Sequence, residues 1–189
     1  TIVDPVFLGY HRMEGAEIST KVIRRRNTDE KVGVCVEKDG KGAIIEYSDM
    51  KEEDMKALDD YGNILYWAGN TAIHILNLGL IKRINYHGFA LPYHRALKHI
   101  DSITPDKKKI KLTGWKIETF VFDAIPFAQN ACFMEVVRKE EFSPVKNSEG
   151  IDSVETARAD MVNLYKDWLE SEGFKVPTGT QVEISPLFA

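Results

Sequence analysis

Short apolar runs separated by polar turn residues dominate the first half of the chain, and this pattern predicts strands. The runs that have strand length are residues 6–10, 31–37, 43–47, 64–67 and, further on, 131–138. Between two of them lies Lys38-Asp39-Gly40-Lys41-Gly42. Asp-Gly between two apolar runs is a strong hairpin signal, so 31–37 and 43–47 are expected to pair. The basic stretch 21–26 is expected to face solvent.

A different periodicity predicts the helices. Ser48 is expected to cap a polar helix that runs to about residue 60, and further helices are expected from Thr71 and over 81–86. The most regular pattern is 152–172, where Asp152 and Glu155 resemble a capping box and Gly173 ends the helix. Residues 115–128 fit either period. Strands mixed with helices predict an α/β protein.

Composition narrows the function classes. The chain has 189 residues, of which 43% are hydrophobic and 10% aromatic, so a buried core is expected rather than disorder. The net charge of -4 argues against a nucleic-acid partner. No apolar run approaches the roughly 20 residues that span a bilayer, so no membrane partner is expected. Two cysteines, Cys35 and Cys132, predict a reducing compartment and hence a cytoplasmic location.

The two ends of the chain suggest that it is a fragment. It begins at Thr1 without methionine and ends on the apolar stretch 184–189. We therefore expect a piece of a longer protein.

Sequence motifs for catalysis are absent. The five histidines lack the spacing of a zinc site, and no nucleophile elbow, Walker loop or dinucleotide fingerprint is present. The residues alone therefore indicate no protein nucleophile.

Three local features could bind a ligand, although each has an ordinary explanation. Glu46 lies in an apolar strand, where it either faces water or accepts hydrogen bonds from sugar hydroxyls at a strand end. Asn70 follows Gly69 at an expected strand–loop–helix junction, which is either a plain turn or a site of close backbone approach. Lys146 follows Pro144 in an expected loop, as a surface lysine or as a phosphate-binding charge.

Taken in order, the motifs of the whole chain resemble one family, the eukaryotic UDP-N-acetylglucosamine pyrophosphorylases. Each motif is weak alone, but their shared order along almost the whole chain is specific. The matching stretches are residues 4–9, 31–34, 46–48, 68–70 with His74, 118–123, 141–147, 156–158 and 183–187.

The resemblance implies a Rossmann-like nucleotide-diphospho-sugar transferase with a mixed sheet flanked by helices. Residues 1–146 would be the second, sugar-binding half of the catalytic domain, and 147–189 a linker helix and the start of a C-terminal domain. The N-terminal nucleotide-binding part would be absent, so the chain alone is expected to be inactive.

The implied reaction joins UTP and N-acetylglucosamine-1-phosphate to give UDP-N-acetylglucosamine and pyrophosphate. Sugar-phosphate oxygen attacks the α-phosphate in line, with Mg²⁺ assisting, so no protein nucleophile is needed. The Mg²⁺ ligands are expected outside this chain.

The resemblance also implies site residues. Glu46 would grip the sugar hydroxyls, while Gly33 and Asn70 would also contact the sugar. Phe120 and Phe122 would line the pocket for the N-acetyl group. Lys146 would hold phosphate and is the candidate catalytic residue.

Two departures from the family pattern leave the sugar open. Trp67 stands where the family has the first Asn of Asn-Ala-Gly-Asn, and Ile73 where an Asn precedes His74. One alternative is therefore a UDP-glucose or broad UDP-sugar pyrophosphorylase. A second alternative is a non-catalytic module that binds sugar nucleotides on the same fold.

Overall fold

The computed structural model describes residues 3–88, 91–185 and 187 of the chain. Most of the terminal residues on which the expectation of cut ends rests lie outside the described part. By internal contacts the chain divides into two compact units, Thr1–Met134 and Glu135–Ala189. The functional boundary expected at residues 146/147 is a separate question and stays a prediction.

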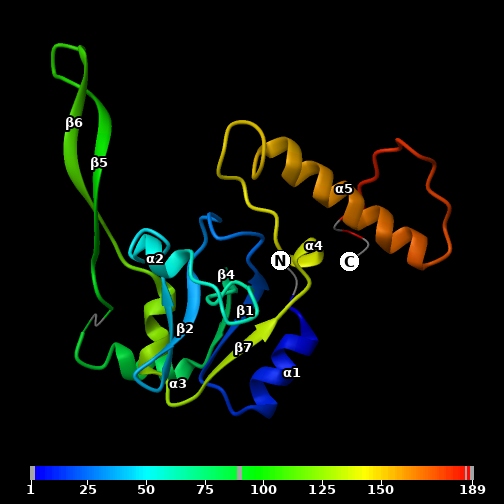
Figure 1. Cartoon of the computed structure of the whole chain (residues 1–189), viewed down its shortest axis with the longest axis horizontal. Helices are drawn as coiled ribbons and strands as arrows, with labels where there is room; N and C mark the ends of the chain where they lie inside the picture. Colours follow the sequence, from blue (N-terminus) through cyan, green and yellow to red (C-terminus); the bar gives the residue numbers. More distant parts are fainter. Residues whose placement is uncertain (1–2, 89–90, 186, 188–189) are drawn as a thin grey trace. The chain divides into compact units, whose positions relative to one another are not determined.

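Figure 1 shows the helices and strands in chain order. They are α1 (Pro5–Met13), β1 (Ile18–Arg24), β2 (Val34–Lys38), β3 (Lys41–Ile45), α2 (Glu52–Met55), β4 (Ala68–Leu76), α3 (Leu78–Ile84), β5 (His94–Ile103), β6 (Lys109–Glu118), the 3-10 helix η1 (Val121–Phe127), β7 (Ala131–Glu135), α4 (Arg138–Glu141) and α5 (Val154–Ser171). None of the helices within the described residues is long and apolar enough to cross a membrane.

A five-stranded sheet in the order β3-β2-β4-β1-β7 forms the centre of the first unit. β1 and β4 are antiparallel neighbours, and so are β2 and β3. Apolar side chains from β1, β3, α3 and η1 form the core, and the largest of them include Ile18, Leu80, Phe122 and Ile125. The predicted α/β class is confirmed.

The β2–β3 hairpin is confirmed with the predicted turn. Val34 pairs with Ile45 and Lys38 with Lys41. Asp39 and Gly40 form the turn with φ of 54° and 72°, the conformation that favours Asp-Gly because glycine has no Cβ to clash. This hairpin positions the end of β3, where Glu46 follows.

The strand predicted for residues 6–10 is wrong, because they lie in helix α1. Asp4 caps this helix: its Oδ1 accepts hydrogen bonds from the backbone N–H groups of Val6 and Phe7. Pro5 occupies the first turn, where its missing N–H costs nothing. Local capping therefore prevails over the strand-like apolar run.

The expected strand–loop–helix junction around Asn70 is also wrong. The segment 64–67, predicted as a strand, is turn and coil apart from an isolated bridge between Ile64 and Leu58, whereas 68–76, predicted as loop and helix, forms strand β4. Register with β1 explains the outcome, because Gly69 pairs with Ile23 and Asn70 with Val22. A Cβ at residue 69 would stand 2.8 Å from Ile23 Cδ1, so a larger residue would have to displace that side chain.

Two further predictions fail at charged segments. Ser48 does not cap a long helix; only α2 forms, because Asp49 and Met50 donate their N–H groups to the Glu46 carbonyl in a turn. The basic segment 21–26 does not simply face solvent, since Lys21 and Arg25 are buried. Lys21 forms a 2.7 Å ion pair with Asp4.

The later predictions hold better. Helix α3 covers part of the helix expected at 81–86, and β7 part of the strand at 131–138. The ambiguous segment 115–128 is both, strand at the end of β6 and 3-10 helix in η1. Helix α5 is confirmed, although its capping box is formed by Ser153 and Thr156, one residue later than predicted.

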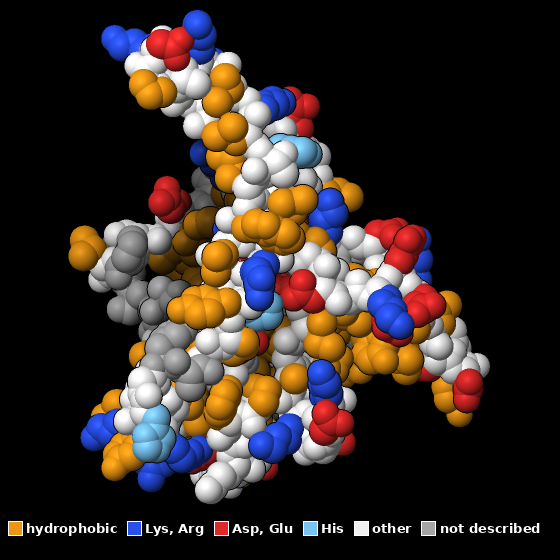
Figure 2. All heavy atoms as spheres, turned by 90° about the vertical axis from the view of Figure 1, so that its left-hand side faces the viewer, with side chains coloured by type: hydrophobic (Ala, Val, Ile, Leu, Met, Phe, Trp, Pro, Cys, Tyr) orange, Lys and Arg blue, Asp and Glu red, His pale blue; other side chains and the backbone are white. Residues whose placement is uncertain are grey.

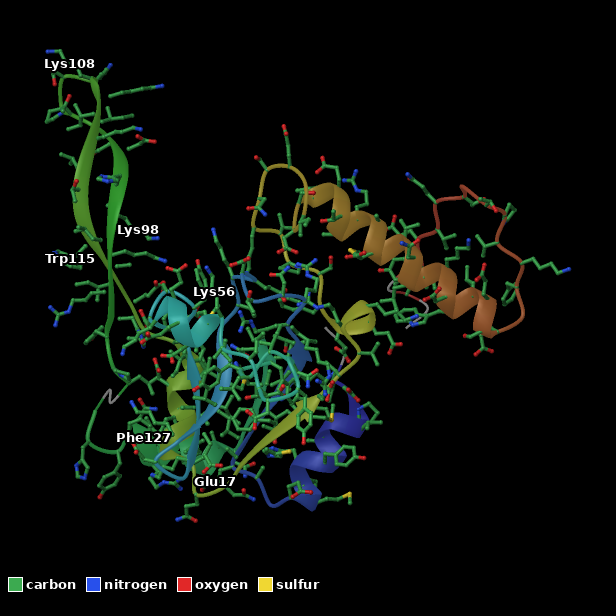
Figure 3. The ribbon with its side chains drawn as sticks, in the orientation of Figure 1. Glu17, Lys56, Lys98, Lys108, Trp115 and Phe127 are labelled. Atoms are coloured by element: carbon green, nitrogen blue, oxygen red, sulfur yellow. The ribbon has the colours of Figure 1, made fainter. Side chains whose placement is uncertain are left out.

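Strands β5 and β6 form a separate two-stranded hairpin that projects from the sheet (Figure 1). Figure 2 shows hydrophobic side chains along this projection. Leu97 pairs with Trp115 across the strands, and both are more than half exposed. Figure 3 shows Trp115 and Lys98 on opposite sides of the hairpin, as the strand alternation requires.

Candidate functional site

Gly33 and Glu46 lie side by side where β2 begins and β3 has ended. Because β2 and β3 pair, Gly33, just before Val34, faces Glu46, just after Ile45. A Cβ at residue 33 would stand 3.1 Å from Glu46 Oε1, so only glycine leaves the carboxylate its present space. Glu46 is half-buried. Glu46 thus follows the end of a strand, and its role as a sugar-binding carboxylate stays a prediction.

Asn70 joins this pair through the backbone. Its N–H donates to the Gly33 carbonyl at 2.8 Å. The buried side chain has a structural task, because Oδ1 accepts a 2.9 Å hydrogen bond from Ala72 N–H. Ala72 has a φ of 62°, so this bond supports an irregularity in β4. The amide NH₂ group of Asn70 is a donor of the kind that binds sugar hydroxyls.

Phe120 and Phe122 stack on one another with ring centroids 4.7 Å apart and an interplanar angle of 12°. Phe122 is 6% exposed and belongs to the core with Ile44 and Ile125. Phe120 is partly buried and packs against that core. Of the two rings, Phe120 is therefore the one with surface left for a ligand.

Lys146 lies in the second unit, in the loop that precedes α5. The backbone N–H groups of Lys146 and Asn147 both donate to the Asp152 carbonyl, at 2.7 and 2.9 Å. These bonds close the loop before the Ser153 cap, and the Lys146 side chain is exposed. The loop predicted for residues 142–147 is confirmed, whereas the phosphate-binding role of Lys146 stays a prediction.

One residue of this region has no signal in the sequence. The imidazole of His94 lies between two carboxylates, with Nε2 2.8 Å from Asp123 Oδ2 and Nδ1 3.2 Å from Asp49 Oδ2. Its ring also packs on Phe120, with centroids 4.7 Å apart. The partners are 45 and 29 residues away in the chain, so spacing could not reveal them.

The charge state of His94 follows from these neighbours. Partial burial opposes the charged imidazole, but hydrogen bonds and charge from Asp123 and Asp49 outweigh it, so the pKa of His94 is raised. The positive form is therefore favoured between the two carboxylates.

The thiols offer no nucleophile. Burial raises the pKa of Cys35 to about 12 and also raises the pKa of Cys132. Both thiols stay protonated near neutral pH, and Cys35 packs against the core.

In the part of the chain that the structure describes, no three or more His, Cys, Asp or Glu residues are arranged to hold a metal ion. Trp67 has a structural contact, because the Arg24 guanidinium lies 4.4 Å from its ring centroid.

Comparison with known proteins agrees with the fold and the motif order. The family described as UTP–glucose-1-phosphate uridylyltransferase matches residues 1–177. The chain belongs to this family, and the resemblance stated from the motifs is confirmed.

Particular relatives share a narrower name. UDP-N-acetylglucosamine pyrophosphorylase of Saccharomyces cerevisiae is 39% identical over 194 residues, covering 97% of this chain and 40% of the relative. UDP-N-acetylglucosamine diphosphorylase 2 of Arabidopsis thaliana is 35% identical, covering 98% and 38%. The crystal structure of the Trypanosoma brucei UDP-N-acetylglucosamine pyrophosphorylase in complex with an inhibitor matches with a TM-score of 0.74 and 29% identity, covering 89% and 33%. The chain thus spans about 40% of the length of these curated relatives.

Proposed function

We propose that this chain is the sugar-binding part of a longer enzyme that makes UDP-N-acetylglucosamine and pyrophosphate from UTP and N-acetylglucosamine-1-phosphate. The observation that supports this best is the apposition of Glu46 and Gly33, with Asn70 bonded to the Gly33 carbonyl. Family membership and the names of the relatives supply the reaction class. The proposal includes the cytoplasmic location expected from the sequence.

The residues would act by positioning the sugar phosphate. The carboxylate of Glu46 accepts two hydrogen bonds from neighbouring hydroxyls, while Gly33 allows the sugar to approach the backbone. Asn70 adds a donor. Fixing the sugar in this way aims its phosphate oxygen at the α-phosphate of UTP, and such positioning supplies much of the catalysis in phosphoryl-group transfer.

The remaining residues would set sugar selectivity and neutralise charge. Phe120, which stacks on Phe122, keeps part of its apolar surface exposed, and such a surface suits the methyl of an N-acetyl group. Lys146 would hold phosphate as a positive charge, which stabilises the negative charge that accumulates in the transition state.

The test is pyrophosphate release by the natural protein that contains this chain, with UTP and either N-acetylglucosamine-1-phosphate or glucose-1-phosphate. Glu46→Gln keeps the size of the side chain but removes its charge, so kcat/KM for the sugar phosphate should fall roughly 10- to 100-fold. The KM for UTP should stay unchanged. The matched control is Glu53→Gln, on the exposed surface of α2.

The sugar preference is tested at Phe120 rather than Phe122, because truncating the buried ring of Phe122 would lower the free energy of unfolding by about 3–5 kcal/mol. Phe120→Leu should reduce the preference for the N-acetylated sugar. A wild-type preference for glucose-1-phosphate would support the UDP-glucose alternative. Binding of UDP-N-acetylglucosamine without turnover of any sugar phosphate would support the non-catalytic alternative. The isolated chain is expected to make no UDP-sugar.

A further inference from the structure

The imidazole of His94 connects segments that are remote in sequence. His94 is the first residue of β5, Asp49 lies in the turn after β3, and Asp123 lies in η1. The two nitrogen–oxygen distances, 3.2 Å to Asp49 and 2.8 Å to Asp123, place the ring between the two carboxylates. We name this arrangement the His94 bridge, composed of Asp49, His94 and Asp123.

On one side the His94 bridge reaches the turn that holds Glu46. The backbone N–H of Asp49 donates to the Glu46 carbonyl at 2.9 Å, and Met50 N–H donates to the same oxygen at 3.2 Å. Asp49 therefore helps to constrain the backbone of the turn at Glu46. A movement of Asp49 would move the carboxylate proposed to grip the sugar.

On the other side the His94 bridge reaches the aromatic pair. The His94 ring packs on Phe120, and Phe120 stacks on the buried Phe122. Asp123 is tied to the same segment, because its N–H donates to the Phe120 carbonyl at 3.1 Å. His94 thus contacts Phe120 directly through its ring. It is also linked to Phe120 indirectly, because it bonds Asp123, whose N–H donates to the Phe120 carbonyl.

Other ionisable groups nearby do not replace this geometry. Glu118 faces His94 across the strands and forms a 2.6 Å ion pair with Lys116, while Tyr93 precedes His94 in the chain. The exposure of the carboxylates differs: the Asp123 side chain is 14% exposed and that of Asp49 is 47% exposed. Asp123 is therefore the stronger partner, because water screens its interaction less.

We propose that His94 is a positioning residue that fixes the distance between the Glu46 turn and Phe120, and thereby the selectivity for an N-acetylated sugar. This rests on the proposed function, which assigns Glu46 to the sugar hydroxyls and Phe120 to the N-acetyl group. His94 does not touch the sugar in this role; it acts through Asp49 and Phe120.

The first experiment measures steady-state kinetics of the natural protein that contains this chain. His94→Ala should raise the KM for N-acetylglucosamine-1-phosphate by about tenfold, equivalent to about 1.4 kcal/mol. The KM for UTP should change by less than about twofold. The preference over glucose-1-phosphate should fall by a similar factor. Asp123→Asn should have a larger effect than Asp49→Asn.

The matched control is His99→Ala, on the same strand. His99 is exposed, and its Nδ1 lies 3.2 Å from Thr113 Oγ1 within the hairpin. His99→Ala should leave the KM for the sugar phosphate and the KM for UTP unchanged. His94→Gln, which retains a donor and an acceptor, should restore part of the sugar preference. If His94→Ala lowers activity equally with both sugar phosphates, or has no effect, the positioning role is wrong.

A second readout separates this proposal from the proposed function. In NMR titrations the His94 imidazole should lose its proton at a higher pH than an ordinary histidine does. Asp123→Asn should lower the pKa of His94 again. His94→Ala should accelerate amide hydrogen exchange in residues 46–50 and 120–123, whereas His99→Ala should not. If the wild type turns over no sugar phosphate, the proposed function fails, and these exchange rates alone support or overturn the bridge between the two segments.

Discussion

The backbone of Gly33 lies against the carboxylate of Glu46: a Cβ at residue 33 would stand 3.1 Å from Glu46 Oε1 and 3.2 Å from Ile44 Cγ2. Contacts this short leave no room for a methyl group unless the carboxylate moves. Because Glu46 follows directly on strand β3, its backbone is held, and the side chain is the part that must shift.

The first prediction concerns this contact. Gly33→Ala should displace the Glu46 carboxylate and raise the KM for the sugar phosphate roughly tenfold, with a loss of stability of about 1–3 kcal/mol from overpacking. The measurements are steady-state kinetics and urea unfolding of the natural protein that contains this chain. The control is Gly9→Ala in α1, where a Cβ would meet nothing within 4 Å. An unchanged KM in Gly33→Ala would contradict the proposed arrangement.

A second prediction concerns acid stability. Arg83 donates two hydrogen bonds to Glu17, at 2.8 and 2.5 Å, and Gln129 N–H donates a third. The hydrogen bonds from Arg83 are the largest cause, and together they lower the pKa of Glu17 from 4.5 to about 2. The Phe127 carbonyl accepts another hydrogen bond from Arg83, at 3.2 Å, and Figure 3 labels Glu17 and Phe127 in this lower part of the first unit.

The lowered pKa fixes the sign of the effect. A carboxylate with a depressed folded-state pKa contributes stability above its ordinary pKa of 4.5, and that contribution disappears as pH falls towards 2. Glu17→Gln should therefore lower the free energy of unfolding at pH 7, and the difference from wild type should vanish near pH 2. Glu53→Gln is the control, since this exposed residue should give little change at either pH. A difference that persists unchanged near pH 2 would contradict the assignment.

A third prediction concerns the buried guanidinium of Arg25. It donates to the carbonyls of Thr28, Tyr66 and Met55, at 2.7, 3.1 and 3.3 Å. Arg25→Ala leaves these acceptors without their charged donor, so urea unfolding should show a loss of about 3 kcal/mol or more. The neighbouring Arg24 is exposed, so Arg24→Ala should lower the free energy of unfolding by about 1 kcal/mol or less. Equal losses of stability in Arg25→Ala and Arg24→Ala would show that the buried hydrogen bonds of Arg25 do not stabilise the fold.

A fourth prediction concerns association through the β5–β6 hairpin. Leu97 and Trp115 are opposite each other, 58% and 63% exposed. Exposed apolar strand faces promote aggregation, so the isolated chain should associate in light scattering. Leu97→Thr combined with Trp115→Thr should lower the apparent mass, whereas Lys98→Thr on the other face should not. A monodisperse wild-type monomer would contradict this prediction.

Local signals explain which predictions succeeded. The β2–β3 turn depends on Asp39 and Gly40, two adjacent residues, and helix α5 on a regular apolar spacing with a nearby serine cap. Both are encoded within a few residues of the chain. The helical start at Pro5 was also encoded locally, by Asp4, but the apolar run after it is typical of a strand as well.

The sequence by itself determined the α/β class, the β2–β3 hairpin, helix α5 and, through the order of its motifs, the family. Only the tertiary structure placed Asn70 inside β4, buried Arg25 and Phe122, and brought His94 between Asp49 and Asp123. The physical reason is range. Turns and caps depend on neighbours along the chain, whereas strand register, burial and the pairing of a histidine with remote carboxylates depend on contacts that exist only after the chain has folded.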